Sequence, residues 1–386
     1  MRIGIDALSV IPNVVGGSET YIRELLCALL TVGSEDEFVV FLSPTNQARF
    51  DGLRDRHLRK IVVPFPSVPR TVRAAGQQLL LPRILKEWNL DVCHYPGSTM
   101  TLRSPCPGVV TIQSLHCLLY PDSFSFTRKH YLRYMTTESA KRAAALIVPS
   151  QDTREAVVRA LGVPPDKVFV VPEGIRGNSQ EAGGPDGVKR FGLESGLYIL
   201  CPCHFLPYKN IETLVRAFHI VKSRYPVPHK LVVAGARVHR KYHQTIQSLI
   251  RSLGLQQEFL DLGMVPCHDM GVLYKNATMC VYPSLCETFG LPVLEAMASG
   301  TPVICSNRGA LPEVAGKAAF LVDPKDFLQL SHVIHQLLSN STVRKMLVSE
   351  GWQRVRQFGW DTAARKTLEV FRRVSRSTSA QGGYSP

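Results

Sequence analysis

The sequence predicts an α/β protein made of two doubly wound domains, each with a parallel sheet covered by helices on both faces. Three observations support this prediction. Short apolar runs alternate with longer amphipathic segments, a length of 386 residues suits two domains better than one, and a glycine-rich polar segment lies near the middle of the chain. Two such domains would face a cleft, with ligands at the carboxyl ends of the strands.

In the first half of the chain we expect strands at the short apolar runs and helices at the amphipathic segments between them. The expected strands are residues 2–8, 38–42, 60–64, 91–95, 108–112, 145–149 and 168–171. The expected helices are residues 19–30, 129–142 and 153–161.

The second half repeats the alternation. Its expected strands are residues 197–201, 230–234, 259–263, 279–282, 302–306 and 319–322. Its expected helices are residues 211–224, 242–253 and 328–338. Because strands and helices alternate in both halves, we expect both sheets to be parallel.

The best linker candidate is the polar, glycine-rich segment 176–187. It gives a first domain of residues 1–178 and a second domain of residues 188–359. An amphipathic helix at about 360–376 is expected to pack back on the first domain. The tail from 375 to 386 is expected to be disordered.

Composition narrows the class of protein. Hydrophobic residues make up 45% of the chain and charged residues 20%, which excludes global disorder. The first residues follow a strand pattern rather than a signal peptide, and no apolar run is long enough to span a membrane. The ten cysteines contain no Cys-x-x-Cys pair, which argues against zinc and fits a reducing compartment. We therefore expect a cytoplasmic protein.

The formal charge of +14 comes partly from basic clusters. They lie at residues 128–133, at residues 237–243, and along the last helix at Arg365, Lys366, Arg372, Arg373 and Arg376. Such clusters attract anionic lipids, nucleic acid or nucleotides, although a solvated basic face explains them equally well. Because no nucleic-acid-binding motif accompanies the charge, we expect no nucleic-acid partner. Peripheral contact with an anionic membrane is a hypothesis that the charge supports.

The most informative stretch runs from Glu287 to Glu295 after an apolar, strand-like run. Pro292 suits the first position of a helix, and the amides near Gly290 and Leu291 would then point out of a positive helix terminus. Amides for an anion and carboxylates for hydroxyl groups together suggest a sugar nucleotide. Taken alone, the stretch fits an ordinary strand–turn–helix unit equally well.

Four further positions are candidate site residues. Gly16-Gly17 follows the first strand, where glycines let a backbone approach a phosphate. Lys209 precedes a helix, where its charge opposes the helix dipole unless an anion binds there. Gln113 and His116 follow the strand at 108–112, and a loop histidine there could bind a sugar hydroxyl or move a proton, although most histidines are incidental.

The chain resembles the retaining, GT-B-fold glycosyltransferases of family four, which consist of two Rossmann-like domains. Residues 283–303 follow the family's Glu-x7-Glu motif, and residues 310–316 and 322–324 continue the match. Residues 207–210 resemble its phosphate-binding lysine loop, and Gly16-Gly17 resembles its amino-terminal glycine loop. The resemblance is specific along residues 198–326 and looser over the first half.

The resemblance implies a role for each matching residue. Glu295 would bind the ribose, Glu287 would contact the donor sugar near the reacting carbon, and Lys209 would hold the diphosphate. Other parts of the donor site would come from Gly16, Gly17, His204, Val265, Phe289, Gly290 and Leu291. The resemblance further implies transfer with retained anomeric configuration and no metal or other cofactor, in keeping with the absence of an Asp-x-Asp pair.

Two departures from the family pattern bear on activity. The family commonly has an arginine where this chain has His204, and it commonly reads Thr-Ile-His-Asp where this chain has Thr111-Ile-Gln-Ser114. The usual cleft histidine is therefore Gln113, with His116 three residues later. An amide can bind a sugar hydroxyl but cannot titrate.

These observations lead to one main hypothesis and two alternatives. The main hypothesis is a retaining, metal-independent transferase that moves a hexosyl group from a nucleotide diphosphate sugar to a hydroxyl acceptor. The pattern Pro202-x-x-Phe-x-Pro-x-Lys-Asn favours mannosyl transfer, and the acceptor would be a glycan or a lipid-linked sugar. The alternatives are a sugar-nucleotide binder that has lost catalysis and a sugar-nucleotide epimerase on the same fold.

Overall fold

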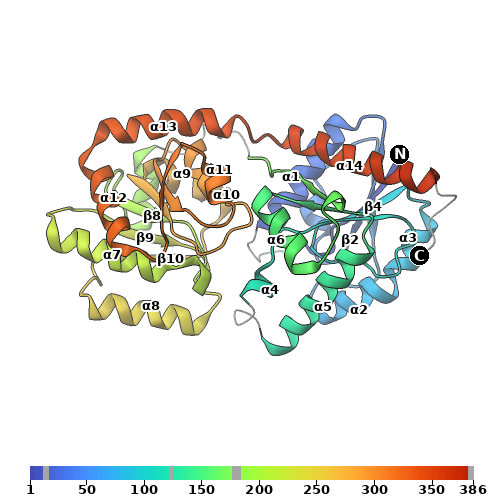
Figure 1. Cartoon of the computed structure of the whole chain (residues 1–386), viewed down its shortest axis with the longest axis horizontal. Helices are drawn as coiled ribbons and strands as arrows, with labels where there is room; N and C mark the ends of the chain where they lie inside the picture. The colour runs from blue at the N-terminus through green and yellow to red at the C-terminus, as the bar shows by residue number, and fades with distance from the viewer. Residues whose placement is uncertain (12–16, 121–124, 176–183, 381–386) are drawn as a thin grey trace. The chain divides into compact units, whose positions relative to one another are not determined.

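The computed structural model describes residues 1–11, 17–120, 125–175 and 184–380, and the chain forms two compact units (Figure 1). Unit 1 comprises residues 1–174 and 359–386, and unit 2 comprises residues 175–358. The expected domain ends at 178 and 359 lie close to these divisions. Residues 176–183 of the expected linker are outside the described residues.

Unit 1 is built on a seven-stranded parallel sheet in the order β3-β2-β1-β4-β5-β6-β7. The strands are β1 (Arg2–Asp6), β2 (Glu37–Leu42), β3 (Leu58–Val62), β4 (Val92–Tyr95), β5 (Gly108–Thr111), β6 (Ala145–Val148) and β7 (Val168–Val170). The strand order reverses between β1 and β4, which pair in parallel register. In a doubly wound sheet this reversal is the point at which ligands usually bind.

Helices cover both faces of this sheet. One face packs against α1 (Gly17–Val32) and α14 (Trp360–Ala380), whose apolar side chains share one core with β1 and β2. The opposite face packs against α3 (Leu81–Glu87), α5 (Phe126–Arg142) and α6 (Gln151–Leu161). Two further helices in unit 1 are α2 (Arg70–Leu79) and α4 (His116–Leu119).

The last helix belongs to unit 1, although unit 2 precedes it in the sequence. Leu368, Phe371 and Val374 are buried at helical spacing against the first core. The expectation that the tail is disordered from residue 375 is wrong for residues 375–380, which continue α14. Gly174 lies against Trp360, and any Cβ at residue 174 would come within 2.5 Å of the indole ring.

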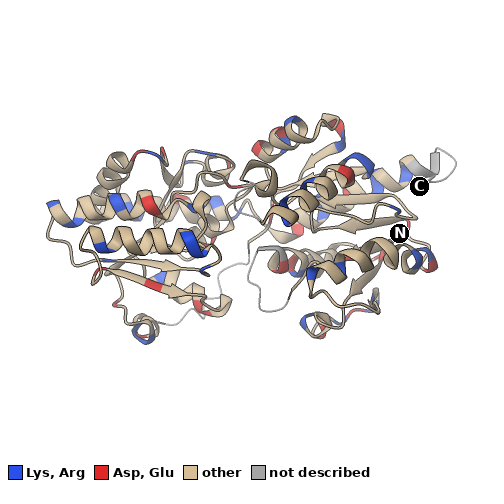
Figure 2. Ribbon diagram, turned by 90° about the horizontal axis from the view of Figure 1, so that it is seen from below, with Lys and Arg blue, Asp and Glu red and all other residues tan. Residues whose placement is uncertain are grey.

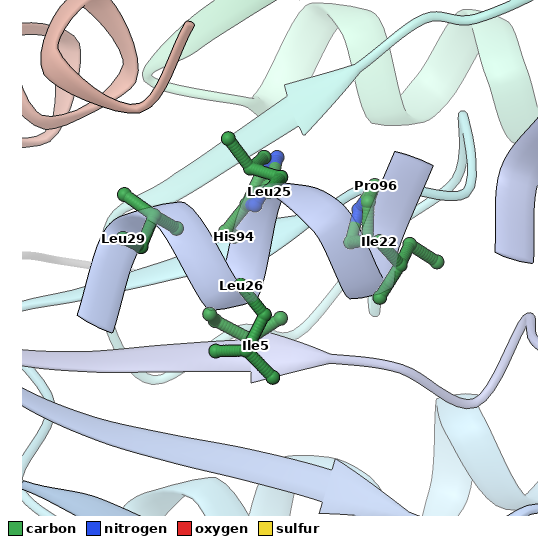
Figure 3. Close-up of a pocket in the computed structure, with 7 residues that line it drawn as sticks. All are labelled: Ile5, Ile22, Leu25, Leu26, Leu29, His94 and Pro96. Carbon is green, nitrogen blue, oxygen red and sulfur yellow. The ribbon is translucent and has the colours of Figure 1, made fainter. Parts of the chain in front are cut away.

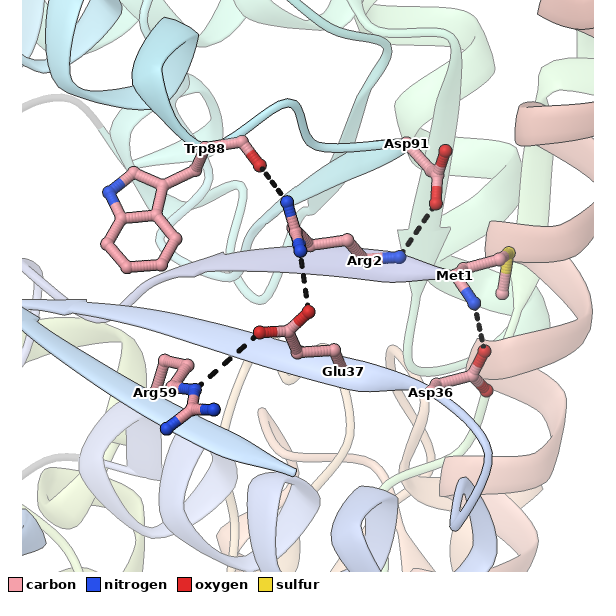
Figure 4. Close-up of polar contacts among 7 residues, drawn as sticks. All are labelled: Met1, Arg2, Asp36, Glu37, Arg59, Trp88 and Asp91. Atoms are coloured by element: carbon pink, nitrogen blue, oxygen red, sulfur yellow. Dashed lines mark hydrogen bonds and ion pairs between the residues drawn. The ribbon is translucent and has the colours of Figure 1, made fainter. Parts of the chain in front are cut away.

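Polar contacts join the amino ends of the strands in unit 1 (Figure 4). The Met1 ammonium pairs with the Asp36 carboxylate at 2.9 Å. The guanidinium of Arg2 pairs with Glu37 at 2.9 Å and donates to the Trp88 carbonyl. These contacts lie at the sheet edge opposite the carboxyl ends, so they fix the register of the strands and leave the other edge for ligands.

Unit 2 has a six-stranded parallel sheet in the order β10-β9-β8-β11-β12-β13. Its strands are β8 (Tyr198–Cys201), β9 (Lys230–Ala234), β10 (Phe259–Gly263), β11 (Met279–Tyr282), β12 (Val303–Ser306) and β13 (Ala319–Val322). Its helices are α7 (Ile211–Arg224), α8 (Arg240–Ser252), α9 (Cys267–Asn276), α10 (Leu291–Ala298), α11 (Leu311–Ala315), α12 (Phe327–Ser339) and α13 (Ser341–Val355). The fold class expected from the sequence is confirmed: both sheets are parallel and doubly wound.

His94 is a buried histidine in the core of unit 1. Its imidazole lies among Ile5, Leu25 and their apolar neighbours (Figure 3). Its Nε2 is 2.7 Å from the Thr111 hydroxyl. Burial lowers the pKa of His94 from 6.5 to about 3. The side chain is therefore neutral in the folded protein at neutral pH.

His94 should make unit 1 sensitive to acid. Between pH 6.5 and about 3 the unfolded chain binds a proton at His94 that the folded chain does not, so the free energy of unfolding falls as the pH falls. The slope from this one group approaches about 1.4 kcal/mol per pH unit. Urea unfolding of His94→Leu should therefore lose less stability than wild type between pH 7 and pH 5.

The exposed His130 on α5 provides the control. His130→Leu should keep the wild-type dependence on pH, because this side chain is exposed rather than buried in the core of unit 1. Equal acid sensitivity in wild type and His94→Leu would contradict the assignment.

Candidate functional site

The topology of unit 2 brings two distant loops together. Strands β8 and β11 are neighbours at the point where the strand order reverses, and Cys280 is paired with Leu200. Because the strands are parallel, the loops at their carboxyl ends meet at one edge of the sheet. The loop after β8 carries Lys209, and the loop after β11 carries Glu287.

Lys209 and Glu287 form an ion pair at this edge. The Lys209 Nζ is 2.6 Å from the Glu287 Oε1 and 2.6 Å from the Tyr282 hydroxyl. The side chains of the pair are only 12% and 8% exposed. The ammonium also lies 5.0 Å from the centre of the Tyr282 ring and 5.3 Å from that of the Tyr208 ring. The lysine is thus enclosed by one carboxylate and two aromatic rings.

The ion pair keeps Lys209 charged despite its burial. Burial alone would lower the pKa of Lys209, but the Glu287 carboxylate and the Tyr282 and Tyr208 phenols outweigh it, and the pKa is raised well above that of a free lysine. A permanent positive charge in a partly enclosed site favours an anionic ligand.

Asn210 holds the lysine loop in place. Its backbone is left-handed, with φ of 57°, which asparagine tolerates better than most residues. Its side-chain amide donates to the carbonyls of Pro283 at 3.0 Å and Pro324 at 2.6 Å. These bonds tie the loop after β8 to the loops after β11 and β13.

Two glycines shape the loop that carries Glu287. Gly290 has φ of 105°, and Gly309 has φ of 61°. A Cβ at Gly309 would come within 2.7 Å of the Glu287 carbonyl, which also accepts a hydrogen bond from the Ala310 amide. The backbone of Glu287 is therefore fixed by the loop after β12.

Glu295 lies on α10, which begins at Leu291 after Gly290. Pro292 is therefore the second residue of the helix, and the expectation that it is the first is wrong by one position. The Tyr274 hydroxyl donates to the Glu295 Oε2 at 2.7 Å. Burial raises the pKa of Glu295, and the Tyr274 hydrogen bond partly opposes this.

The other expected donor-binding residues of unit 2 lie around the same edge or behind it. Phe289 is buried, with its ring 5.7 Å from that of Phe358, so only its backbone can face a ligand. The Val265 side chain also belongs to the core and follows the left-handed Gly263 at the end of β10. The His204 Nδ1 accepts a hydrogen bond from the Ala236 amide at 2.9 Å.

Unit 1 carries the remaining candidates near the ends of β1 and β5. Gly16 is outside the described residues, and Gly17 is the first residue of α1. Gln113 lies in the loop after β5. His116 was expected in a loop but is the first residue of α4, with its Nδ1 beside the Ser114 hydroxyl. That contact orients the imidazole.

The described part of the chain has neither a metal-binding cluster nor a helix that could cross a bilayer. Among those residues, no group of three or more His, Cys, Asp or Glu side chains is placed to hold a metal ion. In the same ranges, no helix has both the length and the apolar character that a bilayer crossing requires.

Comparison with known proteins gives matches in both units. The family model described as glycosyl transferases group 1 matches residues 189–354, and that of Glycosyltransferase Family 4 matches residues 15–176. The chain belongs to the GT-B glycosyltransferases. An O-antigen chain mannosyltransferase B of Escherichia coli is 27% identical to this glycosyltransferase over 303 residues, covering 76% of this chain and 78% of the relative.

Solved structures share the fold of this glycosyltransferase. Sucrose-phosphate synthase from Thermosynechococcus elongatus superposes with a TM-score of 0.75 at 22% identity, over 98% of this chain and 100% of that one. HepE of Anabaena, solved in complex with UDP-glucose, superposes with a TM-score of 0.73 at 17% identity, over 97% and 100% of the two chains. At these identities the likeness supports the fold.

Sequence reasoning missed several polar partners in unit 2 of this glycosyltransferase. Tyr274 donates a hydrogen bond to Glu295, and Tyr282 accepts one from Lys209. In the sequence, however, both tyrosines look like ordinary apolar positions of a helix and a strand. Asp261 accepts hydrogen bonds from Arg237 at 2.8 Å and from His243 at 2.9 Å, close to the end of β10. The basic run at 237–243 is thus partly neutralised, which only the fold reveals.

Breaking the enclosed pair should be costly. Lys209→Ala leaves the Glu287 carboxylate without its ammonium partner, and we expect a loss of about 3 kcal/mol in the free energy of unfolding. The double variant Lys209→Ala/Glu287→Ala should lose less than the sum of the single variants. Urea denaturation of the three variants measures the coupling.

The exposed pair of Arg216 and Glu212, at 2.9 Å, serves as the control. Glu212→Ala should cost less than about 1 kcal/mol, because solvent screens exposed pairs. Equal losses of unfolding free energy in Glu212→Ala and Lys209→Ala would show that the enclosed pair contributes no more to stability than an exposed pair.

Proposed function

We propose that this glycosyltransferase is a retaining, metal-independent enzyme that moves a hexosyl group from a nucleotide diphosphate sugar to a hydroxyl acceptor. The observation that carries the proposal is the enclosed Lys209–Glu287 pair at the reversal point of unit 2. It places a permanent cation and a carboxylate where a doubly wound sheet binds ligands. An incoming diphosphate would compete with Glu287 for the lysine.

Each part of the donor would meet a matching group of unit 2. Lys209 and the backbone amides of Phe289, Gly290 and Leu291 would hold the diphosphate. The Glu295 carboxylate, fixed by Tyr274, would accept hydrogen bonds from the ribose hydroxyls. The backbone near Val265, together with His204, would lie nearer the base.

The reaction exchanges one bond for another at the anomeric carbon. The bond from that carbon to the diphosphate oxygen breaks, and a bond to the acceptor oxygen forms on the same face of the sugar. The proton of the acceptor hydroxyl passes to the departing phosphate oxygen, which gives a nucleoside diphosphate. Lys209 and the amides of residues 289–291 would stabilise the charge that develops on the leaving group. Glu287, released from Lys209, would bind the sugar near the reacting carbon.

Mannosyl is the group favoured for transfer. The loop 202–210 carries the pattern that suggested a mannosyl donor, and the relative from Escherichia coli is described as an O-antigen chain mannosyltransferase. The structural neighbour HepE was solved with UDP-glucose, so the proposal must be tested against uridine donors as well. The acceptor would be a glycan or a lipid-linked sugar, which places the enzyme in glycan or glycolipid synthesis.

Gln113 and His116 would act from unit 1. The Gln113 amide can donate to and accept from sugar hydroxyls without changing charge, and His116 is oriented by Ser114. Their place in the proposal is to position the donor sugar. Proton transfer runs directly from acceptor to phosphate and needs neither side chain.

A lipid-linked acceptor would bring the enzyme to the inner face of a membrane. The net charge of +14, spread over helices of both units, supports peripheral contact with anionic lipids (Figure 2). We propose a cytoplasmic enzyme with such contact.

A panel of nucleotide sugars tests the proposal. Each is incubated with the pure protein, and both thermal stability and released nucleoside diphosphate are measured. We expect GDP-mannose to stabilise the fold and to release GDP slowly without acceptor and faster with glycan extracts. Stabilisation without any release would identify a binding protein, and conversion of the donor sugar without release would identify an epimerase. Either result would overturn the proposal.

Glu287→Gln should separate catalysis from binding. The variant keeps the shape of the side chain but loses the charge near the reacting carbon, so we expect kcat to fall about 100-fold or more. The nucleoside diphosphate Kd should not rise and is expected to fall, because the neutral amide competes less with the diphosphate for Lys209. Initial-rate kinetics and calorimetric titration measure the two quantities. Unchanged turnover would contradict the role of Glu287.

Glu295→Ala should weaken nucleotide binding more than it slows catalysis. Loss of a charge-assisted hydrogen bond to the ribose should raise the Kd of the nucleoside diphosphate about tenfold or more, with a smaller effect on kcat at saturating donor. The exposed Glu350 on α13 provides a control, and Glu350→Ala should leave both quantities unchanged. Wild-type nucleotide affinity in Glu295→Ala would exclude ribose binding by this residue.

A further inference from the structure

Unit 1 exposes apolar and aromatic side chains on two helices. On α5, each of residues 126–134 is exposed or half-buried, and Phe126 and Tyr134 are 72% and 59% exposed. On α2, the terminal Leu79 is 70% exposed and Val72 is 41% exposed. The second half of α5 packs normally, with Met135 and Ala140 buried. The most exposed large apolar side chains of unit 1 among the described residues are thus Phe126, Leu79 and Tyr134, while Val62, Val68 and Leu119 elsewhere in the unit are 45%, 48% and 48% exposed.

The same helices are rich in positive charge and lack negative charge. The sequence has no Asp or Glu from residue 56 to 86 or from residue 123 to 137. These ranges contain Arg56, Arg59, Lys60, Arg70, Arg73, Arg83, Lys86, Arg128, Lys129 and Arg133. Both α2 and α5 have basic residues and no acidic residue in the first turn, where the helix dipole favours the reverse. Folding stability does not explain this placement.

The two helices form one surface. Figure 1 shows α2 and α5 beside each other in unit 1. Burial lowers the pKa of Arg128 on α5, and the positive charges of Arg70 and Arg73 on α2 lower it further, so the three side chains are close together. Burial raises the pKa of Tyr131 on α5, and the positive charge of Arg73 partly opposes this increase. We call the exposed side chains of these helices the basic aromatic face. Its members used below are Arg70, Leu79, Phe126, Tyr131, Arg133 and Tyr134.

We propose that the basic aromatic face docks on the surface of an anionic lipid bilayer. This inference names the surface through which the proposed enzyme would contact a membrane. It rests on the proposed function only for the purpose of the docking, which is to bring the transferase to a lipid-linked acceptor. Basic side chains attract anionic headgroups, and aromatic and aliphatic side chains enter the boundary between headgroups and acyl chains.

The composition of the face favours a bilayer over other anionic partners. Phe126 and Leu79 gain nothing from a phosphate backbone, whereas insertion into a bilayer removes their apolar surface from water. Tyrosine, with an apolar ring and a polar hydroxyl, suits the membrane interface, and Tyr131 and Tyr134 are both exposed. Basic residues lie among these side chains on the same helices, and the Lys129 Nζ is 5.6 Å from the centre of the Phe126 ring, so both kinds of contact can form together.

Vesicle flotation tests the docking surface. Wild type is mixed at low ionic strength with vesicles of phosphatidylcholine alone or of phosphatidylcholine with phosphatidylglycerol. We expect binding only to the anionic vesicles, weakened by salt. Arg70→Glu/Arg133→Glu should bind at least about 25-fold more weakly, because each basic residue near an anionic surface contributes about fivefold. Leu79→Ser/Phe126→Ser should also bind more weakly, with less change in its dependence on salt.

Matched variants in unit 2 control for charge and apolarity. Arg240→Glu/Lys241→Glu changes the net charge equally on the exposed start of α8, and Leu328→Ser/Met346→Ser removes side chains that are 55% and 54% exposed. Both should bind anionic vesicles like wild type. The same losses in these controls, or wild-type binding by Arg70→Glu/Arg133→Glu, would overturn the proposal.

Two further readouts make the result unambiguous. Donor-dependent release of nucleoside diphosphate in solution should be the same in the face variants and in wild type, which shows that they are folded. If the protein binds anionic vesicles through this face but turns over no donor, the proposed function is wrong and the docking surface is still supported. If the wild-type protein ignores anionic vesicles but binds an oligonucleotide through Arg70 and Arg133, the face binds a soluble polyanion and the proposal is wrong.

Discussion

The ion pair between Lys209 and Glu287 is the interaction on which the site of unit 2 depends. Two charges with little exposure to water lose hydration, and only close contact between them and with Tyr282 compensates for that loss. The contact exists because β8 and β11, far apart in the sequence, are neighbours at the reversal of strand order. Each charge of the pair therefore has a partner before a ligand arrives, and an anionic ligand that takes the place of Glu287 must replace its contact with Lys209.

The surrounding loops fix this pair through backbone conformations that few residues adopt. Asn210 in the left-handed region joins three loops, and Gly309 allows the loop after β12 to lie against the Glu287 carbonyl. Substitutions at these positions would move the charged groups without touching them. At the corresponding edge of unit 1, the hydrogen bond between the Ser114 hydroxyl and the His116 Nδ1 orients the imidazole.

Much of the fold followed from the sequence, because short apolar runs with turn residues at both ends are typical of buried parallel strands. Every expected strand is present, with ends within two residues of the expectation. The helices α2, α3, α4, α9, α11 and α13 were not predicted. Among these, α2 is polar and exposed and α11 has five residues, so neither has a long apolar stripe. The tail was misjudged because its polar composition hides a helix that unit 1 stabilises by burying Phe371 and Val374.

The sequence identified the candidate residues of the site, but only the fold shows which of them are in contact. Lys209 and Glu287 were both expected at the donor, but their direct contact required the pairing of β8 with β11. The most direct test of the account is a crystal structure with a bound nucleoside diphosphate. The account predicts that the Lys209 Nζ leaves Glu287 and lies within hydrogen-bonding distance of a phosphate oxygen, with Glu295 on the ribose. A diphosphate bound elsewhere, with the ion pair intact, would contradict it.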